Sequence, residues 1–168
     1  VFGGLYFNTV ALGPQSIDLY ALYLHENLNL AAGDTDFATL GFRIKSKPGA
    51  FAPDAPAPDG KSMADGKSAL PPMKKKAVGL DYELEGVFQT GEVRGLDLTA
   101  WAVHGGVGYT FDTAWMPRVG LGYSYGSGDG DSTDGDIETF QNLFPTNHKF
   151  YGQMDVFSWQ NIHDLEFT

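Results

Sequence analysis

The stretch LDYELEGVFQT, from Leu80 to Thr90, alternates between apolar and polar side chains. One set of alternate positions holds Leu80, Tyr82, Leu84 and Phe88, and the other holds Asp81, Glu83, Glu85 and Gln89. Because the side chains of a β-strand point to opposite faces with a period of two, this pattern predicts a strand with one apolar face and one acidic face. A helix would scatter the same residues around its circumference.

The two-faced pattern recurs along the chain between turn signals. Further strands are predicted at residues 1–12, 17–26, 37–47, 96–111 and 117–126. Within the strand at 96–111 the apolar phase slips near Ala100, which predicts a β-bulge. The many strands and turns predict an all-β fold, an antiparallel curved sheet of about 6–7 strands.

The domain organisation expected from these elements is a single β-barrel segment over residues 1–168, a partial domain of a larger barrel. Residues 48–76 hold six prolines, so they are expected to form a Pro-rich loop insertion rather than strands. Residues 128–147 are expected to form a loop that passes from acidic to aromatic composition. The chain begins without an initiator Met and stops where another strand starts, so an internal fragment is expected.

Composition excludes several classes of protein. The formal net charge of −10 argues against nucleic acid as a partner, because neutralising phosphates requires a basic surface. Cysteine is absent, so neither a disulfide framework nor a thiolate metal site is possible. No run reaches the roughly 18 apolar residues of a transmembrane helix. No cofactor is expected.

The remaining question is which face meets oil and which meets water. In a soluble sandwich the apolar faces meet each other, whereas in an outer-membrane barrel they meet lipid and aromatic residues gather near strand ends. Tyr123 and Tyr125 near one strand end, and Tyr109, Phe111 and Trp115 near another, fit aromatic girdles. The predicted strands are also longer than the about 5–6 residues usual in soluble proteins. The pattern favours the barrel, and a soluble or surface carbohydrate-binding β-protein is the alternative.

Four stretches carry a resemblance to a known family. They are TLGFRIKSK (39–47), LDYELEGVFQTG (80–91), PRVGLGYSYGSGD (117–129) and TFQNLFPTNHKFYGQMDVFSWQNIHDL (139–165). In this order they resemble the alginate-export family of outer-membrane proteins. The resemblance implies a large antiparallel barrel in the bacterial outer membrane, a non-enzymatic channel for an anionic, uronate-type polysaccharide such as alginate. It also implies contact with outer-membrane lipid and possible periplasmic secretion partners.

Charged side chains on the polar faces of the predicted strands are the candidate substrate-binding residues. Cations in a wet lumen would attract carboxylates, as charged rings do in selective pores. Neighbouring strands also carry the opposite charge, so cross-strand pairing explains the same pattern. The candidates are Arg43, Lys45, Arg118, Asp81, Glu83 and Glu85.

Two other kinds of chemistry are compatible with isolated features. Glu83 and Glu85 lie about 6.5–7 Å apart on a strand face, near the separation used by inverting glycosidases, but without an evident desolvating pocket. The segment Asp129–Asp136 begins like a calcium-binding loop but lacks Gly at position six and Glu at position twelve, so a solvated loop is expected. The four histidines have no metal-ligand spacing, and no metal site is expected.

Overall fold

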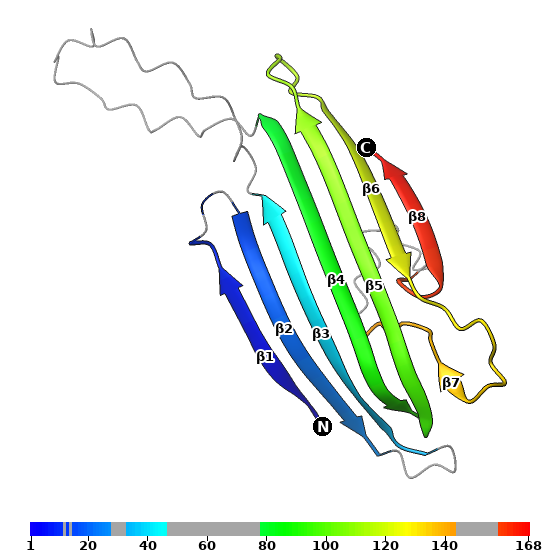
Figure 1. Cartoon of the computed structure of the whole chain (residues 1–168). Helices are drawn as coiled ribbons and strands as arrows, with labels where there is room; N and C mark the ends of the chain where they lie inside the picture. The colour runs from blue at the N-terminus through cyan, green and yellow to red at the C-terminus, as the bar shows by residue number, and fades with distance from the viewer. Residues whose placement is uncertain (12, 14, 28–32, 47–77, 144–157) are drawn as a thin grey trace, which may run out of the picture.

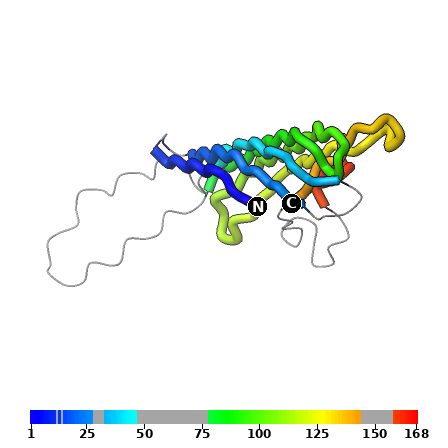
Figure 2. Tube along the Cα trace, turned by 90° about the horizontal axis from the view of Figure 1, so that it is seen from below, coloured from blue at the N-terminus to red at the C-terminus, as the bar shows by residue number. Residues whose placement is uncertain are grey.

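The structure, a computed structural model, describes residues 1–11, 13, 15–27, 33–46, 78–143 and 158–168. These residues form one curved sheet in which seven strands follow one another in chain order, all neighbours antiparallel (Figures 1 and 2). The strands are β1 (Phe2–Thr9), β2 (Gln15–Glu26), β3 (Thr35–Ser46), β4 (Gly79–Val93), β5 (Leu96–Thr110), β6 (Arg118–Gly126), the two-residue β7 (Asp136–Ile137) and β8 (Ile162–Phe167). The predicted all-β, antiparallel, curved sheet is confirmed. The expected Pro-rich insertion at 48–76 lies outside the described residues, and in the described part no helix is long and apolar enough to cross a membrane.

The two ends of the sheet are named here by the loops found there. The Trp115 end carries Gly13 and the loop 111–117, and β3 ends and β4 begins there. The Arg94 end carries the tight β4–β5 turn at Arg94 and Gly95, where both residues have a positive φ. The segment after β6 also leaves from this end (Figure 1).

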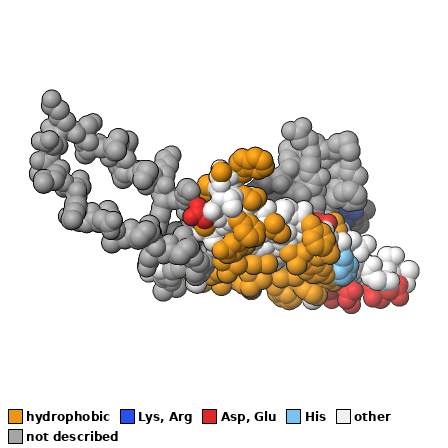
Figure 3. Space-filling view, turned by 90° about the horizontal axis from the view of Figure 1, so that it is seen from above, with side chains coloured by type: hydrophobic (Ala, Val, Ile, Leu, Met, Phe, Trp, Pro, Cys, Tyr) orange, Lys and Arg blue, Asp and Glu red, His pale blue; other side chains and the backbone are white. Residues whose placement is uncertain are grey.

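One face of the sheet, called the outer face, is apolar from edge to edge. Alternate residues of adjacent strands meet there, as shown by the Cα partners Leu40 with Phe88 and Val107 with Leu121. Space-filling shows hydrophobic side chains gathered along this side of the sheet (Figure 3). The residues predicted to share one face do so, each at least 39% exposed: Leu40, Phe42, Leu84, Phe88, Leu121 and Tyr123.

Aromatic rings mark both ends of the outer face on β5 and β6. Toward the Arg94 end, the rings of Trp101 and Tyr125 have centroids 4.3 Å apart, and Tyr125 meets His163 edge-on at 4.8 Å. At the other end, Tyr109 packs against Phe111 at 5.0 Å. The nine residues from Trp101 to Tyr109 span about 26 Å of strand, or about 20 Å across a bilayer if tilted by about 40°.

The opposite, inner face is divided in two. Toward the Trp115 end it is polar, and toward the Arg94 end it carries the buried core of the described structure. This core consists of Phe37, Val87, Leu98, Ala100, Ala102 and Phe140. Phe140 belongs to the segment after β6, which folds back beneath the sheet.

The course of β5 corrects one prediction. Its pairing with β4 runs unbroken from Val93 opposite Leu96 to Gly79 opposite Thr110, so the predicted bulge near Ala100 is wrong. Leu98 is apolar, out of step with Trp101, because it faces inward and is covered there, with 1% of its surface exposed. An apolar residue on the inner face marks the covered region rather than a break in the strand.

The outer face predicts a steep dependence on charge position. Leu84→Arg places a cation in the middle of this face and should lower the free energy of unfolding in lipid bilayers by about 2–4 kcal/mol. Thr90→Arg places the same charge on the same face, beyond the level of Trp101, and should cost about 0–1 kcal/mol. The measurement is urea-induced unfolding of the full-length protein from vesicles. Equal costs for the two variants would contradict a lipid-facing surface.

Candidate functional site

The polar part of the inner face is organised as a row that crosses seven strands. The register brings one side chain from each strand to the same level. Successive Cα partners along this polar row are Asn8, Asp18, Arg43, Glu85, His104, Ser124 and Asp164. Strand period places these side chains on one face, and antiparallel register places them side by side.

Arg43 stands at the centre of this row. Its guanidinium forms an ion pair with Glu83, and its Nε lies 3.9 Å from Glu85 Oε2. Glu85 in turn accepts a hydrogen bond of 2.9 Å from the hydroxyl of Tyr20. The Arg43 side chain is 25% exposed, so about three quarters of it is enclosed by these partners and the sheet.

Tyr20 can reach Glu85 because Gly41 lies between them. A Cβ at Gly41 would collide with the ring and hydroxyl of Tyr20. On the far side of Arg43, Asp18 accepts hydrogen bonds from Tyr6 at 2.7 Å and from Asn8 at 2.5 Å. The charged centre of the row is therefore held from both sides by neutral donors.

Arg118 forms a second charged group nearer the Trp115 end. Its Nε and one terminal nitrogen donate to the two oxygens of Asp81 at 3.1 and 2.7 Å, a bidentate pair. Its other terminal nitrogen donates to Thr168 at 3.0 Å. The side chain lies over Gly108 and Gly120, where a Cβ would clash with the guanidinium. These glycines make room for the arginine.

Lys45 differs from the two arginines. It is the Cα partner of Glu83, yet its ammonium forms no ion pair with any described carboxylate. It lines an inward cleft of about 550 Å³ together with Asp81, Glu83, Arg118 and Glu166. The cleft thus contains Arg118, which is paired with Asp81, and Lys45, which forms no ion pair with a described carboxylate.

All six residues expected from the sequence lie on the inner face. Arg43 is brought to Glu83 and Glu85, and Arg118 to Asp81, so cross-strand pairing is present for both arginines. Sequence reasoning missed further members of the face: Asp18, Tyr20, His104, Ser124 and Glu166. Asp18 had a detectable signal, since it is an acidic residue within an otherwise apolar strand.

The other chemistries gain no support from the described residues. Glu83 and Glu85 both contact the same guanidinium and stand on an open strand face, which is a poor setting for an acid–base pair. In the acidic loop, Asp131 accepts hydrogen bonds from the backbone and hydroxyl of Thr133, and these bonds hold the pKa of its carboxyl below the ordinary value. No group of three or more potential metal ligands is found in the described ranges.

The close approach at Gly41 yields a prediction about this site. Gly41→Ala should force Tyr20 away from Glu85 and lower the free energy of unfolding by about 1–3 kcal/mol. Gly3→Ala is the matched control, because a Cβ at that position meets nothing within 4 Å. In a Tyr20→Ala background the Gly41→Ala cost should largely disappear, since coupled neighbours are non-additive. Full additivity of the two changes, measured by denaturant unfolding, would contradict the contact.

Comparison with known proteins adds one finding. A family model described as alginate export matches residues 1–168, the whole chain. No curated protein and no solved structure matches the chain. The resemblance carried by the four sequence stretches is thereby confirmed.

Proposed function

The chain belongs to the alginate-export family, and from this membership we propose that its inner face is the wall of an outer-membrane channel that passes an anionic, uronate-type polysaccharide such as alginate. The family is one of outer-membrane transport proteins rather than enzymes, and membership supports a role in polysaccharide export in general. The finer assignment of pore wall and contact residues is the proposal.

One observation carries this proposal, the opposite character of the two faces. Apolar side chains cover the outer face. The six residues that were predicted to share this face, from Leu40 to Tyr123, are each at least 39% exposed. The inner face at the same level carries the polar row. An apolar face is stable against lipid and a polar face is stable against water. Both faces of this sheet are therefore favourably solvated when the sheet separates lipid from a water-filled lumen.

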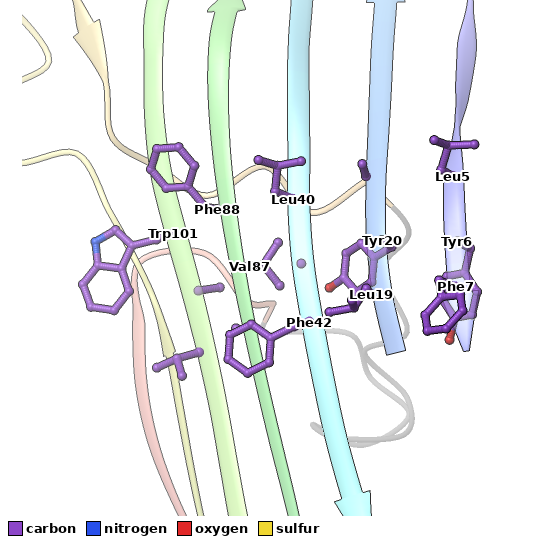
Figure 4. Close-up of a pocket in the computed structure, with 15 residues that line it drawn as sticks. Leu5, Tyr6, Phe7, Leu19, Tyr20, Leu40, Phe42, Val87, Phe88 and Trp101 are labelled. Atoms are coloured by element: carbon purple, nitrogen blue, oxygen red, sulfur yellow. The ribbon is translucent and has the colours of Figure 1, made fainter. Parts of the chain in front are cut away.

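The outer face also supports contact with outer-membrane lipid. An apolar groove of about 760 Å³ runs across β1 to β5 and is lined by Leu19, Leu40, Phe42, Phe88 and Trp101 among others (Figure 4). Such a groove suits acyl chains, because it offers hydrocarbon surface without polar partners. A soluble carbohydrate-binding protein, the alternative left open by the sequence, would need a second sheet over this surface, and the described strands form one sheet only.

The charges of the polar end suggest how a polyanion could pass. Among the described residues, the polar part of the inner face carries three cations and six carboxylates, which are Arg43, Lys45 and Arg118, and Asp18, Asp81, Glu83, Glu85, Asp164 and Glu166. A uronate carboxylate that enters from the Trp115 end would meet Arg118 and then Lys45, which forms no ion pair with a described carboxylate. At Arg43 and Arg118 it would compete with Glu83 and Asp81. Contacts of this kind are strong enough for entry and weak enough for release.

Block of the channel by uronate oligomers tests the proposal. In planar bilayers, Arg43→Ala with Arg118→Ala should weaken the block of the full-length protein by roughly tenfold, since each exposed charged contact is worth about 0.5–1 kcal/mol. Glu83→Gln should deepen the block, because it removes a competitor for Arg43. Arg94→Ala is the control, since Arg94 lies in the exposed turn away from the polar end.

The outcomes separate a transport role from a purely structural one. If neither the double alanine variant nor Glu83→Gln changes the block, the charges serve only to pair with one another. If the unmodified protein shows no block at all by uronate oligomers, the proposed substrate class is wrong.

Loop position suggests which end faces the periplasm. We place the Trp115 end, with Gly13 and the loop 111–117, in the periplasm, where secretion partners would be reached. The acidic loop at the other end then faces the outside. The chain has no cysteine, so single cysteines report sidedness cleanly.

On intact cells, a maleimide too large for the outer membrane should label Ser132→Cys and leave Thr113→Cys unlabelled. Both positions are exposed, so reactivity after membrane disruption should be equal and serves as the control. Labelling of Thr113→Cys on intact cells would show that the orientation is reversed.

A further inference from the structure

At the Arg94 end, the inner face is covered by the chain itself. Residues 127–143, called here the inner segment, leave β6 as an exposed acidic loop and then return beneath the sheet from about Asp136 onward (Figures 1 and 2). Within them, β7 pairs in parallel with β5, with Asp97 opposite Asp136 and Leu98 opposite Ile137. Phe140 packs into the core against residues of β3, β4 and β5 and is 6% exposed.

Gln89 connects this segment to the middle of the sheet. Its side chain is fully buried, although it stands on the inner face of a strand whose polar neighbours are wet. Its Nε2 donates to the backbone oxygen of Gln141 at 2.8 Å and to Thr39 Oγ1 at 3.1 Å. Its Oε1 accepts the backbone N–H of Gln141 at 2.7 Å. The amide thus uses a donor and an acceptor to imitate a strand partner for Gln141.

Ser127 fixes the start of the same segment. Its hydroxyl donates to the backbone oxygen of Glu138 at 2.6 Å and accepts from the backbone N–H of Trp101 at 3.0 Å. Its backbone oxygen accepts the N–H of Phe140 at 3.1 Å. If the segment moved away, Leu98 and Phe37 would face water and these polar groups would lose their partners. These contacts are those of a segment that is stably packed against the sheet.

The inner segment stands beside the polar row along the strands. Gln89 lies four residues from Glu85, about 13 Å along β4. Any chain that passes along the inner face must go by the segment next to the level where the charged side chains act. The segment therefore lies where it can limit width.

We propose that the inner segment is a fixed wall that sets the width of the pore, and that Gln89 is the positioning residue that holds it. The inference rests on the proposed channel function and adds a specificity to it. The wall narrows the passage beside the polar row, so it discriminates against branched or wider solutes. The charged side chains of the polar row then contact a polysaccharide chain that has already been selected by size.

Gln89→Leu tests whether Gln89 holds the inner segment in place, because leucine keeps the bulk of the side chain but cannot form hydrogen bonds with Gln141. In planar bilayers with the full-length protein, its conductance should rise above that of the unmodified protein, since the inner segment would no longer narrow the passage. Larger neutral polyethylene glycols should also enter the pore. Gln15→Leu, at the far end of β2, should change neither quantity. Unchanged conductance and size exclusion in Gln89→Leu would overturn the proposal.

A disulfide distinguishes a fixed wall from a moving gate. Asp97→Cys with Asp136→Cys places two cysteines on adjacent strands in register, within reach of a disulfide. Oxidation should leave the conductance and uronate block of the otherwise unmodified protein unchanged. In the Gln89→Leu background it should restore the original size exclusion, and reduction should abolish it again. Loss of conductance or of block on oxidation alone would mean that the segment must move, and would overturn the fixed wall.

Cysteine labelling measures how well the inner segment covers the sheet, independently of transport. Ala100→Cys lies beneath the segment, at a position with 0% exposure, and should react slowly with a bulky maleimide. Gln89→Leu should speed this reaction at least several-fold. Equal reactivity of Ala100→Cys in both backgrounds would contradict the role of Gln89 in holding the inner segment. Absence of uronate block with an intact labelling difference would contradict the proposed substrate while leaving the wall in place.

Discussion

Unbroken antiparallel pairing across the sheet is the constraint on which the other features depend. In lipid, backbone N–H and C=O groups find no water, so each must bond within the sheet. The central strands β2 to β5 are 12 to 15 residues long and pair with one another over 10 to 15 residues without a bulge. Because pairing is continuous, the parity of a residue decides its face along the whole strand. The apolar outer face and the polar row are both consequences of that regularity.

The faces of the sheet could be predicted from the sequence, but the arrangement of side chains along the inner face could not. Alternation in Leu80–Thr90 depends only on local backbone geometry, so Leu84 and Glu83 were placed on opposite faces correctly. The partnership of Arg43 with Asp18 depends on register, which the loops determine and local pattern does not show. Leu98 was misinterpreted because its partner, Phe140, lies some forty residues further along the chain. In the strand itself, such a returning segment is indicated only by an apolar residue on the inner face, which does not identify the partner.

Charge pairing and substrate contact are compatible roles for the same side chains. Arg43 and Arg118 are oriented by Glu83 and Asp81, and a guanidinium held in place can offer its remaining donors to a passing carboxylate. The glycines beneath Arg118 show that space was left for this orientation. Lys45 supplies the one cation of this end that forms no ion pair with a described carboxylate.

The central claim is that the sheet separates lipid from water, and spin-label accessibility along β4 tests it most directly. Single cysteines at each position from Leu80 to Phe88, labelled with a nitroxide in the full-length protein in bilayers, report contact with oxygen and with a water-soluble nickel chelate. The account predicts a period of two, with the even-numbered positions accessible to oxygen and Asp81, Glu83 and Glu85 accessible to the chelate, whereas Val87, which is buried in the core with Phe140, should be accessible to neither. Accessibility to the chelate at every position, or no alternation between neighbours, would contradict it.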